Sequence, residues 1–406
     1  MATISRRGSV FRSAAFKRFY LGQAFSYLGD GLRTIAIPLL VFRLTGSAVS
    51  LGVTFALEIA PFALFSLLGG SLADRLARRT LMLVCDGIRL AIMLLFAAAY
   101  AAHVLSLPLL YTGVVALAVC GAIFLGCQSS SIPYLLGKDG AKAAVAALVA
   151  TEQGVNLIAP PVGGAIFNLV GPLPALVLNA FTYLTSQISI ASVKDFGPIR
   201  PSGLPELAEL GADIRAGWQF VTRDAALRTL TFAQMCMNAF AIMGFVNIIP
   251  YLKREFGASD QLVGLAFGAI SIGTVLGSIV SGRTHWPFGK ALTAAFILDS
   301  LSWSPTIWTR SLPVAVAAMT TASACGIYAM SSLIAWRMRI IPEAMVGRVF
   351  GVIRLLVIIG MLPGSLAGGI IGDRLGTRTA MLVSSAGYAA LALGLFSLKS
   401  LRSDRR

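Results

Sequence analysis

The stretch Gly69-Gly70-Ser71-Leu72-Ala73-Asp74-Arg75-Leu76-Ala77-Arg78-Arg79 lies between two apolar runs. Each run has about twenty residues, the length that a membrane-spanning helix needs. The stretch therefore predicts a tight turn between two spans. Its two glycines allow neighbouring helices to approach, and its arginines favour the cytoplasmic side of the membrane. Asp74 is an acid at a helix end, where it can face the positive N-terminus of another helix.

The composition of the 406-residue chain is typical of a polytopic membrane protein. Apolar residues make up 57% and charged residues 12% of it, against roughly 45–50% and 25% in soluble proteins. The net charge of +16 does not indicate nucleic-acid binding, because the cations lie between apolar runs rather than in one patch. The basic N-terminus shows no signal-peptide pattern. The five cysteines fall inside apolar segments, so we expect no disulfide, metal site or cofactor.

Twelve apolar runs are long enough to cross a bilayer, which takes about 20 residues. They cover residues 19–43, 49–74, 79–102, 107–136, 143–170, 173–193, 225–251, 261–282, 288–309, 312–336, 345–371 and 378–398. The sequence therefore predicts an all-α membrane protein with twelve transmembrane helices.

The distribution of cations predicts that both termini are cytoplasmic. With the N-terminus inside, 24 of the 33 Lys and Arg residues fall in inside segments and six in outside loops. The remaining three, Arg33, Arg89 and Arg354, lie within spans. This bias fixes the orientation by the positive-inside rule. We expect a multi-pass protein of the plasma membrane, the inner membrane of a bacterium.

Residues 194–224 interrupt the series of spans. Prolines and a glycine between 198 and 205 predict a linker, and apolar residues at helical spacing after them predict an amphipathic helix on the cytoplasmic surface. The expected organisation is an N-terminal six-helix bundle over 1–193, a cytoplasmic linker with this helix over 194–224, and a C-terminal six-helix bundle over 225–406.

Short motifs recur in the same order in both halves. Ile37-Pro38 is echoed by Ile249-Pro250 and Gly163-Gly164 by Gly368-Gly369, at offsets that fall from 212 to 205 residues. Two further motifs recur between them. The pattern predicts a duplicated six-helix unit, typical of secondary transporters, so the two bundles should be pseudo-symmetric.

The opening stretch resembles the signature loop between the second and third helices of the major facilitator superfamily of transporters. The family pattern runs G-x-L-a-D-R-x-G-R-[RK], and Ala77 stands where the family usually has Gly. The resemblance implies that Asp74 holds the two halves together by facing the start of the eleventh helix. Asp86 and Arg89 form an i, i+3 pair near the inner end of the third span, and we expect this pair to form a charge cluster with the arginines of the loop. The resulting gating candidates are Gly70, Asp74, Arg75, Arg78, Arg79, Asp86 and Arg89.

Acidic residues within spans are the candidates for proton coupling, because an ionisable group in the bilayer costs at least ~2.5–3.5 kcal/mol. They are Asp30, Glu152 and Glu58. Asp30 is the first choice, since it lies mid-span in the first helix with Arg33 on the same face. The alternative for Asp30 is a structural ion pair with Arg33. Glu152, with Asn156 one turn on, either lines a cavity or joins two helices by a hydrogen bond.

Polar residues within the spans are the candidates for the wall of a substrate cavity. Gln234 and Asn238, one turn apart, can equally hold helices together. For Asp299 and Arg354 the sequence does not decide between a place in the cavity wall and a structural role. The full set is Arg33, Gln128, Asn156, Gln234, Asn238, Asp299 and Arg354.

The fifth predicted span carries Ala159-Pro160-Pro161-Val162-Gly163-Gly164. Two prolines remove backbone donors and bend a helix, and paired glycines permit close packing at the bend. The stretch resembles the G-P-x-x-G-G antiporter motif of drug/proton exchangers, with Ala159 in place of the first Gly. A generic kinked helix is the alternative. With a related motif in the eleventh span, the helix-kink residues are Pro160, Pro161, Gly163, Gly164, Pro363 and Gly364.

Almost the whole chain resembles the macrolide-efflux and enterobactin-exporter branch of the superfamily. The likeness is carried by Gly29-Asp30 before Ile37-Pro38, by Thr45-Gly46-Ser47, by Gly217-Trp218-Gln219-Phe220 and by Pro342-Glu343-Ala344-Met345-Val346-Gly347-Arg348-Val349. The larger drug-efflux branches carry an arginine in the fourth helix. Residues 119–126 contain none, so a proton-relay role at that position is not carried over.

These observations predict a proton-coupled exporter, an antiporter of amphipathic small molecules such as drugs or siderophores that works by alternating access. Its partners would be the substrate, protons and the lipid bilayer, with the protein as a monomer. No enzyme signature or catalytic residue is found, and no phosphate-binding loop. The alternatives are an importer or lipid flippase of the same fold and, from another class, a non-transporting receptor or sensor. A receptor would need an appended soluble domain, and the longest non-membrane stretch has about 31 residues.

Overall fold

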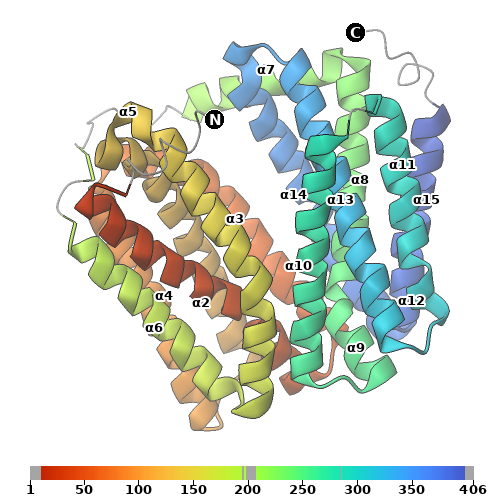
Figure 1. Cartoon of the computed structure of the whole chain (residues 1–406), viewed down its shortest axis with the longest axis horizontal. Coiled ribbons are helices and arrows are strands. Elements are labelled where there is room, and N and C mark those ends of the chain that lie inside the picture. The colour runs from red at the N-terminus through yellow and green to blue at the C-terminus, as the bar shows by residue number, and fades with distance from the viewer. Residues whose placement is uncertain (1–10, 194–195, 198–206, 285, 398–406) are drawn as a thin grey trace. The chain divides into compact units, whose positions relative to one another are not determined.

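The computed structural model describes residues 11–193, 196–197, 207–284 and 286–397 (Figure 1). Within its helices, the side chains of 66–75, 138–139, 207–210 and 396–397 lie outside the description. The predicted linker residues 198–206 and the terminal cations in 1–10 and 398–406 also lie outside the described residues. The described part of the chain is helical and contains no strand.

The chain divides into two compact units. The first consists of Met1–Leu44, Leu57–Leu204 and Ser259–Gly268, and the second of Thr45–Ala56, Pro205–Ala258 and Ala269–Arg406. Two long helices, α3 (Ala48–Arg75) and α10 (Asp260–Arg283), therefore begin in one unit and end in the other.

The first unit is built from long apolar helices. Besides most of α3 it contains α2 (Ala14–Thr45), α4 (Arg78–Ala101), α5 (Leu107–Leu169) and α6 (Pro172–Ala191). The cytoplasmic loop expected over 137–142 is replaced by a break within α5. Only Gly137 leaves the helical conformation there, with φ of 73°, a left-handed value that glycine adopts readily because it lacks a Cβ.

The second unit contains the remaining helices. They are α7 (Leu207–Arg223), α8 (Ala225–Val246), α9 (Ile248–Phe256), α11 (Phe288–Trp303), α12 (Pro305–Trp308), α13 (Leu312–Ile340), the 3₁₀ turn η1 (Glu343–Met345), α14 (Val346–Arg374) and α15 (Thr377–Ser397). The predicted amphipathic helix of the linker corresponds to α7. Asp224 caps α8, its side chain accepting a hydrogen bond of 2.7 Å from the backbone N–H of Leu227.

Ten helical segments of the described chain are long and apolar enough to cross a membrane. They coincide with ten of the predicted spans. The other two predicted spans, 288–309 and 378–398, are also helical. The first of them is α11, of 16 residues, followed after Ser304 by the short α12, and the second is α15. The all-helical, polytopic class is thus confirmed, whereas the number twelve stays a prediction.

Glycines set the closest helix contacts in the second unit. Gly360, Gly364 and Gly368 of α14 face α8, where a Cβ added to Gly364 would lie 2.9 Å from the Cα of Ala239. Small residues at such a seam let two backbones meet without a large side chain between them. Pro363 lies inside this continuous helix, so the eleventh-span motif forms a packing surface against α8.

The start of α3 is anchored by Asp373 at the end of α14. The Asp373 carboxylate accepts hydrogen bonds from the backbone N–H of Ala48 at 2.8 Å and of Val49 at 3.0 Å, and from the Ser47 hydroxyl at 2.5 Å. Arg254 pairs with the same carboxylate at 2.7 Å. An acid at a helix N-terminus satisfies free N–H groups and complements the helix dipole. This anchor fixes the N-terminal end of α3.

Candidate functional site

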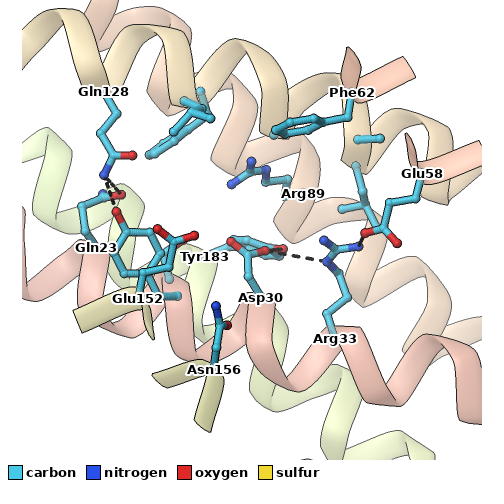
Figure 2. A pocket seen from close by; sticks show the side chains of 17 residues that line it. Gln23, Asp30, Arg33, Glu58, Phe62, Arg89, Gln128, Glu152, Asn156 and Tyr183 are labelled. Atoms are coloured by element: carbon cyan, nitrogen blue, oxygen red, sulfur yellow. Dashed lines mark hydrogen bonds and ion pairs between the residues drawn. The ribbon is translucent and has the colours of Figure 1, made fainter. Parts of the chain in front are cut away.

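A polar cavity of about 210 Å³ lies within the first unit (Figure 2). Its wall draws on α2, α3, α4, α5 and α6, and all the residues that line it belong to this unit. Charged and hydrogen-bonding groups face apolar ones across it. The ionisable side chains of the wall are Asp30, Arg33, Glu58, Arg89, Glu152, Tyr27 and Tyr183.

Arg33 pairs with two carboxylates of the cavity. Its Nη1 lies 2.8 Å from Oε1 of Glu58, and its Nε lies 3.7 Å from Oδ1 of Asp30. The sequence hypothesis placed Arg33 with Asp30, but the shorter ion pair is with Glu58 on another helix. The side chain of Arg33 is 16% exposed, whereas those of Asp30 and Glu58 are 36% and 31% exposed. The cation is therefore largely enclosed, while both carboxylates remain open to the cavity.

Asp30 has a second partner in Tyr183 of α6. The Tyr183 hydroxyl donates a hydrogen bond of 2.6 Å to Oδ1 of Asp30. The tyrosine is fully buried, so this bond fixes one carboxylate oxygen from the closed side. Asp30 thus lies between a buried neutral donor and a cation that Glu58 holds, with part of its surface facing the cavity.

The position of Asp30 is set by glycines on both sides of it. A Cβ on Gly29 would lie 2.8 Å from Cβ of Thr182 in α6, and one on Gly31 would lie 2.5 Å from Cβ of Ala159 in α5. Asn179 donates a hydrogen bond of 2.8 Å to the carbonyl of Gly29. Because α2 touches α6 and α5 at the residues flanking Asp30, the carboxylate has little freedom to move along the cavity.

Arg89 also enters the cavity wall, which the sequence did not indicate. Its guanidinium lies over the rings of Phe124 at 5.0 Å and Tyr183 at 5.4 Å, distances at which cation–π attraction operates. Gly121 makes room for it, since a Cβ there would lie 3.0 Å from Nη2 of Arg89. Asp86 pairs with Arg89 at 3.5 Å from a fully buried position.

The predicted charge cluster of this pair with Arg78 and Arg79 stays a prediction. Arg78 donates to the carbonyl of Phe196 at 3.2 Å and stacks over the ring of Tyr134. Arg79 donates to the carbonyl of Ala191 at 2.7 Å. Arg89, about three turns further along α4, lines the cavity. The other gating candidates, Gly70, Asp74 and Arg75, have side chains outside the described residues.

A chain of side-chain amides closes one end of the cavity. Nε2 of Gln128 donates to the hydroxyl of Tyr27 at 2.9 Å and to Oε1 of Gln23 at 3.2 Å. Gln23 in turn donates to the hydroxyl of Ser186 at 3.2 Å. Gln128, a cavity candidate, is therefore held in a network that joins α5, α2 and α6. Asn156 and Glu152 line the same cavity from the second half of α5 (Figure 2).

The proline and glycine motif of α5 faces the start of α10. The helix continues through Pro160 and Pro161. A Cβ on Gly164 would lie 2.7 Å from the Cα of Gly264, and one on Gly264 would lie 2.6 Å from the carbonyl oxygen of Pro160. Gly163 faces α2 instead, where an added Cβ would lie 3.2 Å from Cδ2 of Leu32. The motif thus brings three helices of the first unit to close contact.

The cavity candidates of the second unit lie in separate environments. Gln234 is buried, and its Oε1 accepts a hydrogen bond from Arg337 of α13. Asn238 donates to the carbonyl of Gln234 in its own helix at 2.9 Å. Asp299 is 2% exposed, and its Oδ1 has no hydrogen-bond partner among the described residues. Arg354 is exposed on α14.

Arg337 corrects the sequence analysis, which counted it among the cations of a cytoplasmic loop. It lies inside α13 and is 1% exposed. Besides Gln234, it contacts the hydroxyl of Thr231 at 3.4 Å. In the sequence, the signal for this contact was the pair of polar residues Thr231 and Gln234, one turn apart on an apolar span, which indicates a polar partner on another helix.

Taken together, several long apolar helices and a charged cavity enclosed by five of them define a polytopic membrane protein of the transporter class. The profile of the family described as transmembrane secretion effector, in the major facilitator superfamily, matches residues 7–405, and the chain belongs to this family. The resemblance inferred from the sequence is thereby confirmed.

Relatives of known name agree with this assignment. The chain is 24% identical over 400 residues to the enterobactin exporter EntS of Shigella flexneri, covering 97% of this chain and 93% of EntS. It is 24% identical over 256 residues to the multidrug efflux pump Tap of Mycobacterium tuberculosis, covering 62% and 61% of the two chains. A bacterial homologue of the human lysosomal transporter Spinster has the same fold, with a TM-score of 0.73 at 16% identity and 98% coverage of both chains. The protein is a multi-pass membrane transporter, not an enzyme.

Proposed function

We propose that this protein is a proton-coupled exporter of amphipathic small molecules that works by alternating access. Relatives named as a multidrug efflux pump and an enterobactin exporter support export as the direction. The proposed architecture has twelve spans, with six-helix bundles at 1–193 and 225–406 joined by a cytoplasmic linker at 194–224. Both termini would lie in the cytoplasm of a bacterial cell, and the monomer would be the working unit.

Asp30 is the proposed proton carrier, and one observation carries this assignment. Its side chain is 36% exposed and lines the cavity, while its carboxylate is hydrogen-bonded to the buried Tyr183 and lies 3.7 Å from Arg33. A carrier must exchange its proton with the cavity yet remain fixed in the protein. Glu58 and Glu152, which line the same cavity, are the next candidates.

The wall of the cavity supports an amphipathic substrate. Phe62, Leu117, Phe124 and Leu125 provide apolar surface in the same cavity as the charged groups. Such a wall binds a molecule with both an apolar body and polar groups, because the apolar surface supplies most of the affinity and the few polar groups fix the orientation. Gating by Asp74 and the neighbouring arginines remains part of this proposal, carried by the signature loop.

The test is to measure two activities of purified Asp30→Asn in proteoliposomes. Transport driven by a pH gradient should be lost, because the amide cannot carry a proton. Exchange of labelled for unlabelled substrate should persist, since exchange moves no net proton. Asp213→Asn is a matched control, because Asp213 is an exposed acid paired with Arg348 and should retain both activities.

Intact pH-driven transport by Asp30→Asn would exclude the carrier role and direct attention to Glu58 and Glu152. Loss of both activities with a folded protein would assign Asp30 to substrate binding instead. Substrate accumulation in the opposite direction would support an importer, movement of labelled phospholipid a flippase, and binding without any flux a receptor.

A further inference from the structure

A second cavity lies in the second unit, apart from the charged site. It has a volume of about 280 Å³ and is enclosed by α10, the segment after it, α11 and α13. Apolar side chains dominate its wall. The wall owes its hollow shape to small residues on all three helices, which are Gly277, Ala291, Ala294, Ala295 and Ala324.

The cleft begins where α10 and α13 stop touching. The hydroxyls of Thr274 and Ser323 lie 2.7 Å apart. At Gly277 an added Cβ would lie 2.6 Å from Cγ2 of Ile327. From this contact toward the C-terminal end of α10, the wall continues through Val280 and Thr284, so the hollow extends along the last turns of that helix.

The rim of the cleft is apolar and open. Leu276, Val280 and Leu298 are all more than half exposed, and Trp286 is 63% exposed. Both α10 and α13 have the length and apolarity of membrane spans, so we expect the rim to face hydrocarbon rather than water. An apolar hollow of this kind excludes water, and the hydrocarbon that surrounds it is the material available to fill it.

Cations lie at the end of the cleft where α10 leads into α11. Arg283 adjoins the lining residue Thr284, and Lys290 adjoins the lining residue Ala291. Both are exposed, and neither forms an ion pair with a carboxylate of the described chain. Trp286 lies between them in sequence and lines the cleft, and tryptophan favours the boundary between acyl chains and headgroups.

We propose that this cleft binds one anionic phospholipid, with an acyl chain in the hollow and the phosphate against Arg283 and Lys290. Basic sites between membrane helices on the cytoplasmic side attract acidic headgroups, and the connection from α10 to α11 lies on the side that we propose to be cytoplasmic. The proposal is independent of proton coupling, because no residue of the cleft lines the charged cavity.

Native mass spectrometry of the full chain in detergent tests the proposal by titration with phosphatidylglycerol and phosphatidylcholine. The wild-type protein should bind one phosphatidylglycerol at least tenfold more tightly than phosphatidylcholine. The double variant Arg283→Gln/Lys290→Gln should lose this preference while keeping the weaker binding. Ala324→Phe, which fills the hollow, should weaken the binding of both lipids.

Two controls match these variants. Arg310→Gln removes an exposed cation at the other end of α13, and Ala317→Phe adds the same ring to an exposed position of α13 outside the cleft. Both should bind lipid like the wild type. An unchanged preference in the double glutamine variant would overturn the proposal, as would unchanged binding by Ala324→Phe. If Ala324→Phe does not fold, the lipid preference of the double glutamine variant alone tests the proposal, because that variant leaves the hollow intact.

Discussion

The two units differ in how the buried ionisable side chains are partnered. In the first unit, Arg33, Glu58 and Asp30 meet in one cavity, at 2.8 and 3.7 Å, and the two carboxylates are partly exposed. In the second unit, Asp299 and Arg337 are each almost completely buried, and no described residue of opposite charge pairs with either. Neutral groups alone, Gln234 and Thr231, bind Arg337.

The difference is between ionisable groups that are paired and open to a cavity and ionisable groups that are enclosed without a partner of opposite charge. Paired charges open to a cavity can gain or lose a proton at moderate cost, because water and the partner compensate the change. An enclosed single charge has no such compensation, and burying it unpaired costs far more. On this comparison rests our proposal that proton coupling belongs to the first unit, with a structural role for the isolated polar groups of the second.

The largest effect is expected from removing the cation of the cavity. Arg33→Gln removes the ion-pair partner of both Asp30 and Glu58 and leaves Arg89 as the remaining cation of the cavity wall. We expect pH-driven transport to fall at least a hundredfold and the free energy of unfolding to fall by about 3 kcal/mol, the lower end for a broken buried pair because both carboxylates are partly exposed. Transport assays and denaturant titration in detergent measure the two quantities.

A double-mutant cycle sharpens this result. Adding Glu58→Gln to Arg33→Gln should recover part of the lost stability, with a coupling of about 1–3 kcal/mol. Arg348→Gln is the control, since its ion pair with Asp213 at 2.6 Å is about half exposed, and it should change stability by less than about 1 kcal/mol. A cycle with no coupling would contradict the pairing seen in the cavity.

Much of the fold was predictable, because span length and hydrophobicity are local properties. Ten predicted spans coincide with helices of membrane-crossing length. An interruption between residues 136 and 143 was predicted, but as a loop, whereas only Gly137 leaves the helical conformation there. The split of α11 from α12 at Ser304 was not predicted, because the apolar run 288–309 continues through it.

The site was predictable only in part, because pairing across helices depends on rotation and depth. Asp30, Glu58 and Glu152 were identified as ionisable residues within spans, and all three line one cavity. That Arg33 pairs more closely with Glu58 than with its neighbour Asp30 was not visible from spacing. Arg337 was assigned to a loop because a span end cannot be located to better than one turn from hydropathy.

The second effect concerns the buried cation of the second unit. Gln234→Leu removes the acceptor of Arg337 and should lower the free energy of unfolding by about 1.5–3 kcal/mol, the usual range for a hydrogen bond to a charged group. Adding Arg337→Met should restore most of the loss, because an apolar pair of similar size needs no partner. Substrate exchange in the double variant should equal that of the wild type.

Asn238→Leu is the matched control for this cycle. Asn238 lies one turn from Gln234 on α8 and donates to the carbonyl of Gln234 at 2.9 Å. This bond lies within one helix and involves no charged group, so its loss should cost less than Gln234→Leu. A double variant that folds but does not transport would show that Arg337 acts in transport, and the contrast between the units would fail.

The smallest change in stability is expected for a substitution of Asp299, and a small change there is informative about the form of this acid. An ionised carboxylate with an unpartnered buried oxygen would be very costly, so the neutral acid is the form that fits this position. Cys325 of α13, Tyr388 of α15 and Trp303 of its own helix lie near it, and no cation of the described chain forms an ion pair with it. Asparagine has nearly the shape of the neutral acid. Asp299→Asn should therefore change the free energy of unfolding by less than about 0.5 kcal/mol.

The same substitution at Asp30 and at Asp299 then separates the two units by function. Asp30→Asn should lose pH-driven transport and keep exchange, whereas Asp299→Asn should keep both in the same proteoliposome assay. Each change removes one acidic proton from one mid-span aspartate, so a difference between them reports the surroundings and not the chemistry of the substitution. If Asp299→Asn instead loses only the pH-driven activity, the enclosed acid must exchange its proton during transport. Proton coupling would then belong to the second unit, and exposure in a single conformation would be no guide to the carrier.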